Sequence, residues 1–319
     1  MPPSQPTDDP ILVTNLAGLS LRNPVMLAAG THGTLDEFGD VCPLDTVGAV
    51  VTKSLTPEPR EGNPTWRILD VRGGAGMLNA IGLANPGVDR FCEHLAERAA
   101  GMPTVVVGSA AGFSIEDYVR VVGTLDAWGD RGIPAIELNV SCPNVRTGTE
   151  FGHSPGLIRE LMTAVRPAAT RTKLFVKLSP VTPDLVGVAR AAIEAGADAL
   201  TLCNTMPAMA IDVRTRRPRL ANVTGGLSGP GVHPVAVRLV HEVYRGVAKD
   251  AGVPIIGVGG VMGWEDAAEF ILAGATAVQM GTALLADPRS PRRVVAGLRR
   301  WVRGQGAGSV SELIGALRI

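Results

Sequence analysis

The sequence predicts an α/β fold, a (β/α)8 TIM barrel. Short apolar runs of strand length alternate with segments of helical periodicity, and the chain contains eight such pairs. Continuous apolar runs are typical of parallel strands covered by helices on both faces. Eight parallel strands close a barrel, and about 250 residues suffice for one. Because no linker divides the chain, residues 11–319 are predicted to form a single domain.

The expected elements follow from these runs in chain order. The predicted strands are residues 25–30, 49–54, 104–110, 135–141, 174–179, 199–204, 254–260 and 277–282. The predicted helices are residues 35–46, 88–100, 114–129, 155–165, 183–195, 234–251, 264–273 and 288–302. Ser114-Ile-Glu-Asp117 and Thr182-Pro-Asp184 are typical helix start signals.

The N-terminal region precedes the first barrel strand. Residues 1–10 have neither an apolar core nor a basic start, so they are predicted to be a short disordered lead rather than a signal or anchor. Residues 11–13 and 19–21 flank a glycine turn, which predicts a β-hairpin at the bottom of the barrel. No run approaches the roughly 18 apolar residues of a membrane span.

Composition narrows the function classes. The chain is 45% hydrophobic, enough for a full core, and its 30 basic and 30 acidic residues balance. No global field therefore favours nucleic acid or an anionic membrane. The four cysteines lie far apart and the five histidines show no metal-ligand spacing. This excludes a zinc or iron–sulfur site built by this chain alone and favours a reducing cytosol.

Two predicted strand-to-helix connections are long. Residues 55–85 follow the second strand and residues 205–233 follow the sixth. Long connections in compact domains are usually functional, and both belong to the face where barrel enzymes place their sites. The second contains four arginines, which indicate either a solvated loop or a protein contact surface: Arg214, Arg216, Arg217 and Arg219.

The stretch from Glu137 to Asn144 carries the first chemical signal. It starts as a buried strand and breaks into a loop at Pro143, gathering the carboxamides of Asn139 and Asn144 around the thiol of Cys142. A thiol among donors and acceptors can take a proton from a bound ring. The alternative is a small buried hydrophobe in a turn, the usual role of a free cysteine.

Glycines end the last two predicted strands, at Gly257-Val-Gly-Gly260 and Gly281-Thr282. They allow backbone N–H groups to approach a phosphate, and a following helix start would favour its charge. This is the common phosphate position of the barrel, and Gly229 on the preceding long loop would complete it. The alternative is a pair of plain tight turns.

Lysines are scarce, and two of them close apolar strands, Lys53 the second and Lys177 the fifth. Alternation along a barrel strand points such residues inward, toward a ligand. Because an unpartnered buried lysine is costly, they indicate either an electrostatic clamp on an anion or an imine-forming amine. Carboxamides that would hold the edge of a flavin or pyrimidine ring lie at strand ends and in the first long loop: Asn79, Asn139, Asn144 and Asn204.

Several motifs together resemble one family, the dihydroorotate dehydrogenases. They are Asn139-Val-Ser-Cys-Pro-Asn144, Gly76-Met-Leu-Asn-Ala-Ile-Gly-Leu83 with Asn85-Pro-Gly, and Asn204-Thr205 followed by Met209-Ala-Ile-Asp212. Thr215-Arg-Arg-Pro218 leading to Thr224-Gly-Gly-Leu-Ser-Gly-Pro230 resembles the type B branch of class 1. The similarity runs in register over residues 12–285. Class 2 members resemble the chain less, since they have serine in place of Cys142 and an N-terminal membrane helix.

The resemblance implies an FMN enzyme that oxidises dihydroorotate to orotate in pyrimidine biosynthesis. Cys142 would be the base that takes the C5 proton while the C6 hydride passes to flavin N5. The implied substrate-binding residues are Lys53, Asn79, Ala80, Ile81, Gly82, Leu83, Asn139, Asn144, Asn204 and Thr205. The implied FMN-binding residues are Ala29, Gly30, Lys53, Ser54, Ser109, Asn139, Lys177, Cys203, Gly229, Gly259, Gly260, Gly281 and Thr282.

The resemblance also implies partners. Type B enzymes pass electrons to a subunit that carries FAD and a [2Fe–2S] cluster and then to NAD, and class 1 relatives suggest a homodimer. The chain departs from the family at Ala29, Ser109, Cys203 and Pro207. These departures leave open another dihydropyrimidine or a specialised metabolite as substrate. A barrel lyase that uses Lys53 or Lys177 as a Schiff-base amine, and a non-catalytic partner protein, are further alternatives.

Overall fold

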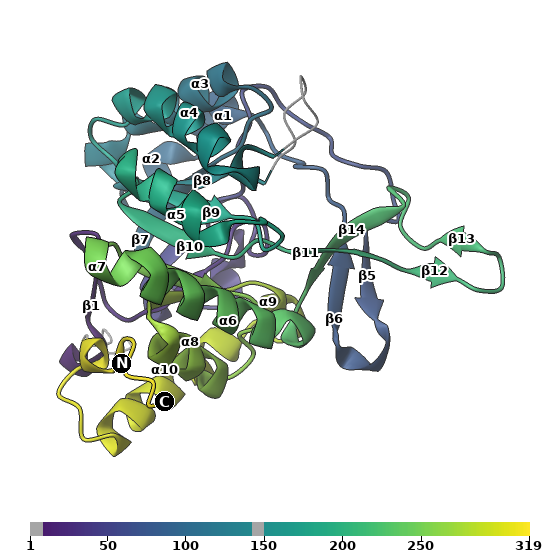
Figure 1. The fold of residues 1–319 in the computed structure, drawn as a ribbon. Helices are drawn as coiled ribbons and strands as arrows, with labels where there is room; N and C mark the ends of the chain where they lie inside the picture. The colour runs from purple at the N-terminus through teal and green to yellow at the C-terminus, as the bar shows by residue number, and fades with distance from the viewer. Residues whose placement is uncertain (1–8, 142–149) are drawn as a thin grey trace.

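The computed structural model describes residues 9–141 and 150–319, and its centre is a closed barrel of eight parallel strands (Figure 1). Each strand pairs with its neighbours in chain order, and the last returns to the first. The prediction of a (β/α)8 barrel is confirmed. The strands are β3 (Val25–Leu27), β4 (Ala49–Val51), β7 (Val105–Ala110), β8 (Ala135–Asn139), β9 (Lys173–Leu178), β10 (Ala199–Leu202), β15 (Ile255–Val258) and β16 (Ala275–Met280).

Most strands end two or three residues earlier than predicted. The apolar runs continue beyond the last ladder bonds, but the backbone turns away at the barrel mouth, where Gly30, Gly259 and Gly260 have φ of 79°, 141° and 69°. Glycine adopts this left-handed region without a Cβ penalty. The residues predicted as strand ends therefore form the turns that surround the barrel mouth.

Helices surround the barrel (Figure 1). They are α1 (Val88–His94), α2 (Ala96–Ala99), α3 (Ile115–Asp126), α4 (Pro155–Val165), α5 (Leu185–Glu194), α6 (His233–Val243), α7 (Lys249–Ala251), α8 (Trp264–Ala273), α9 (Thr282–Ala286) and α10 (Ser290–Gly304). Ser114 caps α3 as predicted, because its hydroxyl accepts a hydrogen bond from the Asp117 amide. Helix α5 begins two residues later than predicted, and Asp184 caps it by accepting from the Gly187 amide.

Three helix predictions need correction. Residues 35–46 form two 3-10 turns, η2 (Glu37–Asp40) and η3 (Leu44–Thr46), because Pro43 cannot donate in a helix interior. Residues 88–100 break between α1 and α2, and residues 234–251 contain a π-helical segment, η9 (Tyr244–Ala248). The short helix α9 was not predicted. The other short helices are η1 (Pro10–Leu12), η4 (Arg72–Gly74), η5 (Gly129–Arg131), η6 (Phe151–His153), η7 (Arg166–Ala168), η8 (Pro230–Val232) and η10 (Val310–Leu313).

A β-hairpin closes the bottom of the barrel. Its strands are β1 (Thr14–Leu16) and β2 (Leu19–Leu21). The predicted first strand at residues 11–13 is therefore wrong, because residues 10–12 form the 3-10 turn η1. Leu16 and Leu21 are fully buried against interior residues such as Met26 and Phe175. The lower interior is therefore apolar and filled. Residues 1–8 lie outside the described residues, so the predicted lead remains a prediction there.

The two long connections meet in a single antiparallel sheet. β5 (Ile68–Val71) and β6 (Gly76–Asn79) come from the first, and β11 (Met206–Met209) and β14 (Thr224–Ser228) from the second. Their order is β11-β14-β6-β5, with β14 pairing to β6 across the two connections. The sheet lies beside the barrel, and the ribbon β12 (Ile211–Asp212) and β13 (Arg217–Pro218) projects beyond it (Figure 1). Both connections are thus ordered structure.

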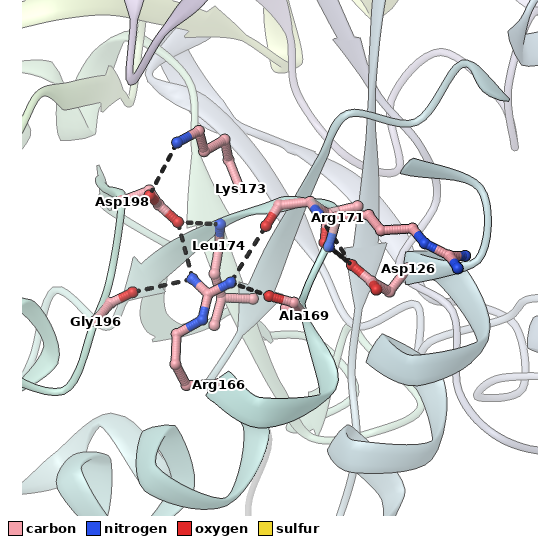
Figure 2. A network of polar contacts seen from close by, with 9 residues as sticks. Asp126, Arg166, Ala169, Arg171, Lys173, Leu174, Gly196 and Asp198 are labelled. Atoms are coloured by element: carbon pink, nitrogen blue, oxygen red, sulfur yellow. Dashed lines mark hydrogen bonds and ion pairs between the residues drawn. The ribbon is translucent and has the colours of Figure 1, made fainter. Parts of the chain in front are cut away.

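Two aspartates fasten the lower ends of β9 and β10 (Figure 2). Asp198 accepts hydrogen bonds from the Leu174 amide and from Arg166. Asp126, at the end of α3 and buried, accepts four hydrogen bonds from the turn before β9: from the Thr170 hydroxyl, the Arg171 amide, and the amide and hydroxyl of Thr172. Burial alone would raise the pKa of Asp126, but these hydrogen bonds lower it below its ordinary value.

We expect Asp126→Ala to lower the free energy of unfolding by about 3 kcal/mol, since it leaves buried donors without an acceptor. Urea denaturation at pH 7 measures this. Asp130→Ala is the matched control, because the Asp130 side chain is 82% exposed and lies 3.9 Å from Arg171. That variant should change stability by less than about 0.5 kcal/mol.

The pH dependence of the same pair supplies a second check. Because the folded pKa of Asp126 is depressed, its contribution is complete above the unfolded pKa and is lost as the pH falls through the folded value. The stability difference between wild type and Asp126→Ala should therefore be constant from pH 6 to 8 and shrink in acid. A difference that grows in acid would contradict this role.

Candidate active site

A cavity of about 430 Å³ opens at the C-terminal ends of the barrel strands. Of the predicted site residues, those that line it are Ala29, Gly30, Lys53, Ser54, Asn79, Ala80, Ile81, Gly82, Leu83, Asn139, Lys177, Cys203, Asn204, Thr205, Gly229, Gly259, Gly260, Gly281 and Thr282. A volume of this order suits a small-molecule or cofactor site. Residues as far apart in the sequence as Ala29 and Thr282 thus share one cavity.

Among the described residues, one predicted site residue, Ser109, does not line the cavity. Cys142 and Asn144 lie outside the described residues, so their predicted roles remain predictions. Ser109, on β7, is fully buried, and its hydroxyl lies 2.9 Å from that of Ser54 in a hydrogen bond. Ser54 lines the cavity and Ser109 does not, so Ser109 supports a lining residue from below.

The floor of the cavity carries a buried ion pair. The Lys177 ammonium nitrogen on β9 lies 3.6 Å from Oε1 of Glu137 on β8, and the two side chains are 10% and 0% exposed. Oε2 of Glu137 accepts hydrogen bonds from the Thr201 hydroxyl at 2.8 Å and the Gln279 amide at 2.6 Å. Four strands therefore contribute to one polar layer.

Sequence reasoning missed Glu137 and Gln279 as members of the site. The signal was present, because a charged and an amide side chain each interrupt an apolar strand run. Such a residue is rarely buried without a partner. Its spacing of two from Asn139 also places Glu137 on the interior face of β8.

Carboxamides form one side of the cavity. The Asn204 amide donates to Oδ1 of Asn139 at 2.9 Å, and Oδ1 of Asn204 accepts from the Thr205 amide at 2.9 Å. Asn79 on β6 donates to the Gly226 carbonyl of β14 at 3.2 Å. These bonds fix which amide edges face the cavity, so the wall presents both donors and acceptors.

Lys53 supplies a second cation at the rim. A Cβ placed on Gly30 would lie 3.0 Å from the Lys53 ammonium nitrogen, so the missing side chain at Gly30 leaves room for that group. Lys53 lies just beyond β4, and Lys177 lies on β9. Both lysines line the cavity, as the alternation along the strands predicts, and the carboxylate of Glu137 lines it as well.

Glycines and hydroxyls form a polar corner between β15 and β16. Gly229, Gly259, Gly260 and Gly281 line it together with Thr282, whose hydroxyl donates to the Ser228 hydroxyl at 2.7 Å. Without Cβ atoms the backbone can approach an anion closely. A helix start was predicted to favour the charge of a bound phosphate here. The helix that follows, α9, has only five residues, so its contribution to that interaction is small.

Residues of the antiparallel sheet complete the wall, and sequence reasoning did not include them. Met77 on β6 and Leu227 and Ser228 on β14 line the cavity. They meet there only because β6 and β14 pair across 150 residues of sequence. Short strands inside long connections gave no periodic signal.

Cys203 is a buried thiol in the cavity wall. Burial raises its pKa to about 12, although the charge on Lys177 acts in the opposite direction. The thiol is therefore neutral near pH 7 and contributes a contact rather than a base.

Over residues 9–141 and 150–319, no three histidine, cysteine, aspartate or glutamate side chains gather in a way that would hold a metal ion. Within the same ranges, no helix has the length and apolar character needed to cross a membrane.

The chain is similar over nearly its whole length to proteins of one known family. The family model for dihydroorotate dehydrogenase matches residues 11–302. The chain is 46% identical over 309 residues to the catalytic subunit of dihydroorotate dehydrogenase B (NAD(+)) of Trichlorobacter lovleyi, 47% to that of Pelobacter propionicus and 45% over 312 residues to that of Bacteroides thetaiotaomicron. Each alignment covers 97% of this chain and 99% of the relative. The chain therefore belongs to the dihydroorotate dehydrogenase family, in its class 1, type B branch.

Proposed function

We propose that this protein is an FMN-dependent enzyme that oxidises dihydroorotate to orotate in pyrimidine biosynthesis. The observation that carries the proposal is the cavity itself, where two ammonium groups, three carboxamides and a glycine corner converge. The names of the relatives, which are dihydroorotate dehydrogenase catalytic subunits, support the substrate.

The residues of the cavity fit FMN in chemical character. The glycine corner with Thr282 suits a phosphate, and Lys177 suits the negative charge of a reduced isoalloxazine ring. Ala29, Gly30 and Cys203 are small enough to leave room for a flat ring. When bound, FMN supplies the acceptor for a hydride and thus for two electrons.

The protein's own groups account for the rest of the reaction. The substrate loses a proton from C5 and a hydride from C6, which leaves a carbon–carbon double bond. We assign the proton to Cys142, acting as a general base. Lys53 neutralises the substrate carboxylate, while Asn79, Asn139 and Asn204 hold the alternating N–H and C=O groups of the ring.

The ion pair argues against the Schiff-base alternative for Lys177. An imine-forming amine must be free to approach a carbonyl carbon, but the Lys177 nitrogen is held 3.6 Å from the Glu137 carboxylate in a buried ion pair. The experiment below with other reduced pyrimidines tests whether a related dihydropyrimidine is the substrate.

We further propose that the protein works with an electron-transfer subunit, forms a homodimer and is located in the cytoplasm. The names of the relatives, which specify a catalytic subunit and NAD(+), support a partner subunit that passes electrons to NAD. The resemblance to type B enzymes implies that this subunit carries FAD and a [2Fe–2S] cluster. The resemblance to class 1 supports a homodimer of this chain, and the composition supports a cytoplasmic location.

The purified protein should be yellow, with a flavin absorption spectrum, and dihydroorotate should bleach it under anaerobic conditions because the flavin becomes reduced. Stopped-flow spectroscopy measures the bleaching. A panel of other reduced pyrimidines serves as the comparison. A colourless protein that binds no added FMN would refute the proposal, and faster bleaching by another pyrimidine would reassign the substrate.

Cys142→Ser should slow flavin reduction by dihydroorotate about 100-fold or more while FMN stays bound. Serine has a much higher pKa than cysteine, and general-base catalysis contributes a factor of this order. Stopped-flow bleaching at matched pH measures the rate, and the bound flavin spectrum is the control. An unchanged rate would remove Cys142 from the reaction.

Gly260→Ala should weaken FMN binding at least tenfold. A Cβ there would lie 2.7 Å from both the Gly229 carbonyl oxygen and Cβ of His233, so the corner must shift. Titration of apoprotein with FMN, followed by quenching of flavin fluorescence, measures the affinity.

The matched control for this variant is Gly252→Ala. Gly252 has φ of +66° against +69° for Gly260, but nothing lies within 4 Å of its added Cβ. Both variants carry similar backbone strain, so only Gly260→Ala should lose FMN. Thr282→Val, which removes one hydroxyl of the corner, tests the same region if Gly260→Ala does not fold. Equal FMN affinity in all variants would place the phosphate elsewhere.

A further inference from the structure

The carboxylate of Glu137 is the least expected group in the cavity floor. It is fully buried, yet it lines the cavity, and its Oε1 accepts no hydrogen bond within the part of the chain that the structure describes. Below it lies the apolar lower layer with Phe175 and Met26. Its position is costly unless the charge has a use or a partner.

Hydrogen-bond donors surround the side chain of Glu137. Thr201 and Gln279 direct a hydroxyl and an amide group at Oε2, and Lys177 directs an ammonium at Oε1. All three neighbours can donate, and a carboxylate can only accept. The two short bonds to Oε2 hold the side chain while Oε1 remains directed at the lysine.

The strand register makes this pairing rigid. Lys177 lies beside Asn139 on β8 and Thr201 on β10, and Glu137 precedes Asn139 by two residues on the same face. Lys177 on β9 thus lies between two neighbouring strands. Thr201 on β10 holds the carboxylate of Glu137, and Glu137 on β8 contacts the ammonium of Lys177. The ammonium sits at the upper edge of this layer, and it lines the cavity.

We propose that Glu137 is a positioning residue that holds Lys177 at the cavity floor and partly offsets its charge, and thereby sets the reduction potential of the flavin. This rests on the proposed function. With Glu137 in place, the pair is neutral before reduction, and the site gains a net negative charge when the flavin becomes anionic. Without the carboxylate, the uncompensated ammonium would favour the reduced flavin more strongly.

The experiment compares the affinity of apoprotein for oxidised FMN with its affinity for reduced FMN. For Glu137→Gln, which keeps size and hydrogen bonding, the preference for reduced FMN should increase about tenfold. For a two-electron couple this equals a rise in midpoint potential of about 30 mV. Lys177→Gln should shift the preference in the opposite direction, and the double variant should lie between the single ones.

Two further variants separate charge from structure. Thr201→Val removes one hydrogen bond to Glu137 but keeps the carboxylate, so the flavin preference should change much less than in Glu137→Gln. Glu137→Asp keeps the charge and should restore most of the wild-type preference. Thermal unfolding of each apoprotein shows whether it is folded. If Glu137→Gln does not fold, the comparison of the double variant with Lys177→Gln measures the effect of removing the carboxylate.

The outcomes are distinguishable. If wild-type apoprotein binds neither form of FMN, the proposed function fails. If wild type binds FMN and oxidises dihydroorotate but Glu137→Gln leaves the preference unchanged or lowers it, only the role of Glu137 is refuted. An equal shift in Thr201→Val would also refute it, because the effect would then follow from packing rather than charge.

Discussion

The central constraint in this molecule is the burial of two opposite charges at one level of the barrel. Removing one partner of a buried pair typically costs about 3–5 kcal/mol, since the other charge is left uncompensated. Glu137 and Lys177 therefore depend on each other, and Thr201 and Gln279 must supply the remaining hydrogen bonds. Below this polar layer the barrel is filled by apolar residues and closed by Leu16 and Leu21. Above this layer the cavity opens. The layer therefore separates the apolar core, which stabilises the fold, from the cavity, which binds the ligand.

The cavity also depends on a second structure that the barrel does not provide. The sheet β11-β14-β6-β5 joins two connections that are far apart in sequence and brings Asn79, Leu227 and Ser228 to the barrel mouth. Close packing between its strands and the turns explains some glycines: a Cβ on Gly76 would lie 2.0 Å from the Ser228 carbonyl oxygen. One wall of the site is therefore built from backbone pairing across these connections, and the other from barrel strand ends.

The sequence predicted the parts of this structure that repeat. Continuous apolar runs located all eight barrel strands, and the lysines that interrupt or end them, Lys53 and Lys177, line the cavity as expected. Periodicity could not locate strand ends, because turns at Gly30 and Gly260 begin inside apolar runs. Nor could it reveal the pairing of β6 with β14, which is non-local, or the break at Pro43 in the predicted helix 35–46. The role of Glu137 could not be predicted from its own strand, because its partners Lys177, Thr201 and Gln279 lie on three other strands.

The polar layer of Glu137 and Lys177 lies between the apolar lower interior and the cavity, and this order determines how the site stabilises a charge on a bound ligand. A charge that appears in the cavity is opposed or favoured mainly by the groups nearest to it, because the apolar layer below offers no dipoles that could reorient. Lys177 and Glu137 therefore act as a fixed pair whose net effect depends on geometry rather than on solvent. The thiol of Cys203, neutral because burial raises its pKa to about 12, adds no charge to the wall. Few charged groups therefore determine the electrostatic potential that a ligand experiences at the cavity floor. Among them, the carboxylate of Glu137 sets how much of the charge of Lys177 acts on that ligand.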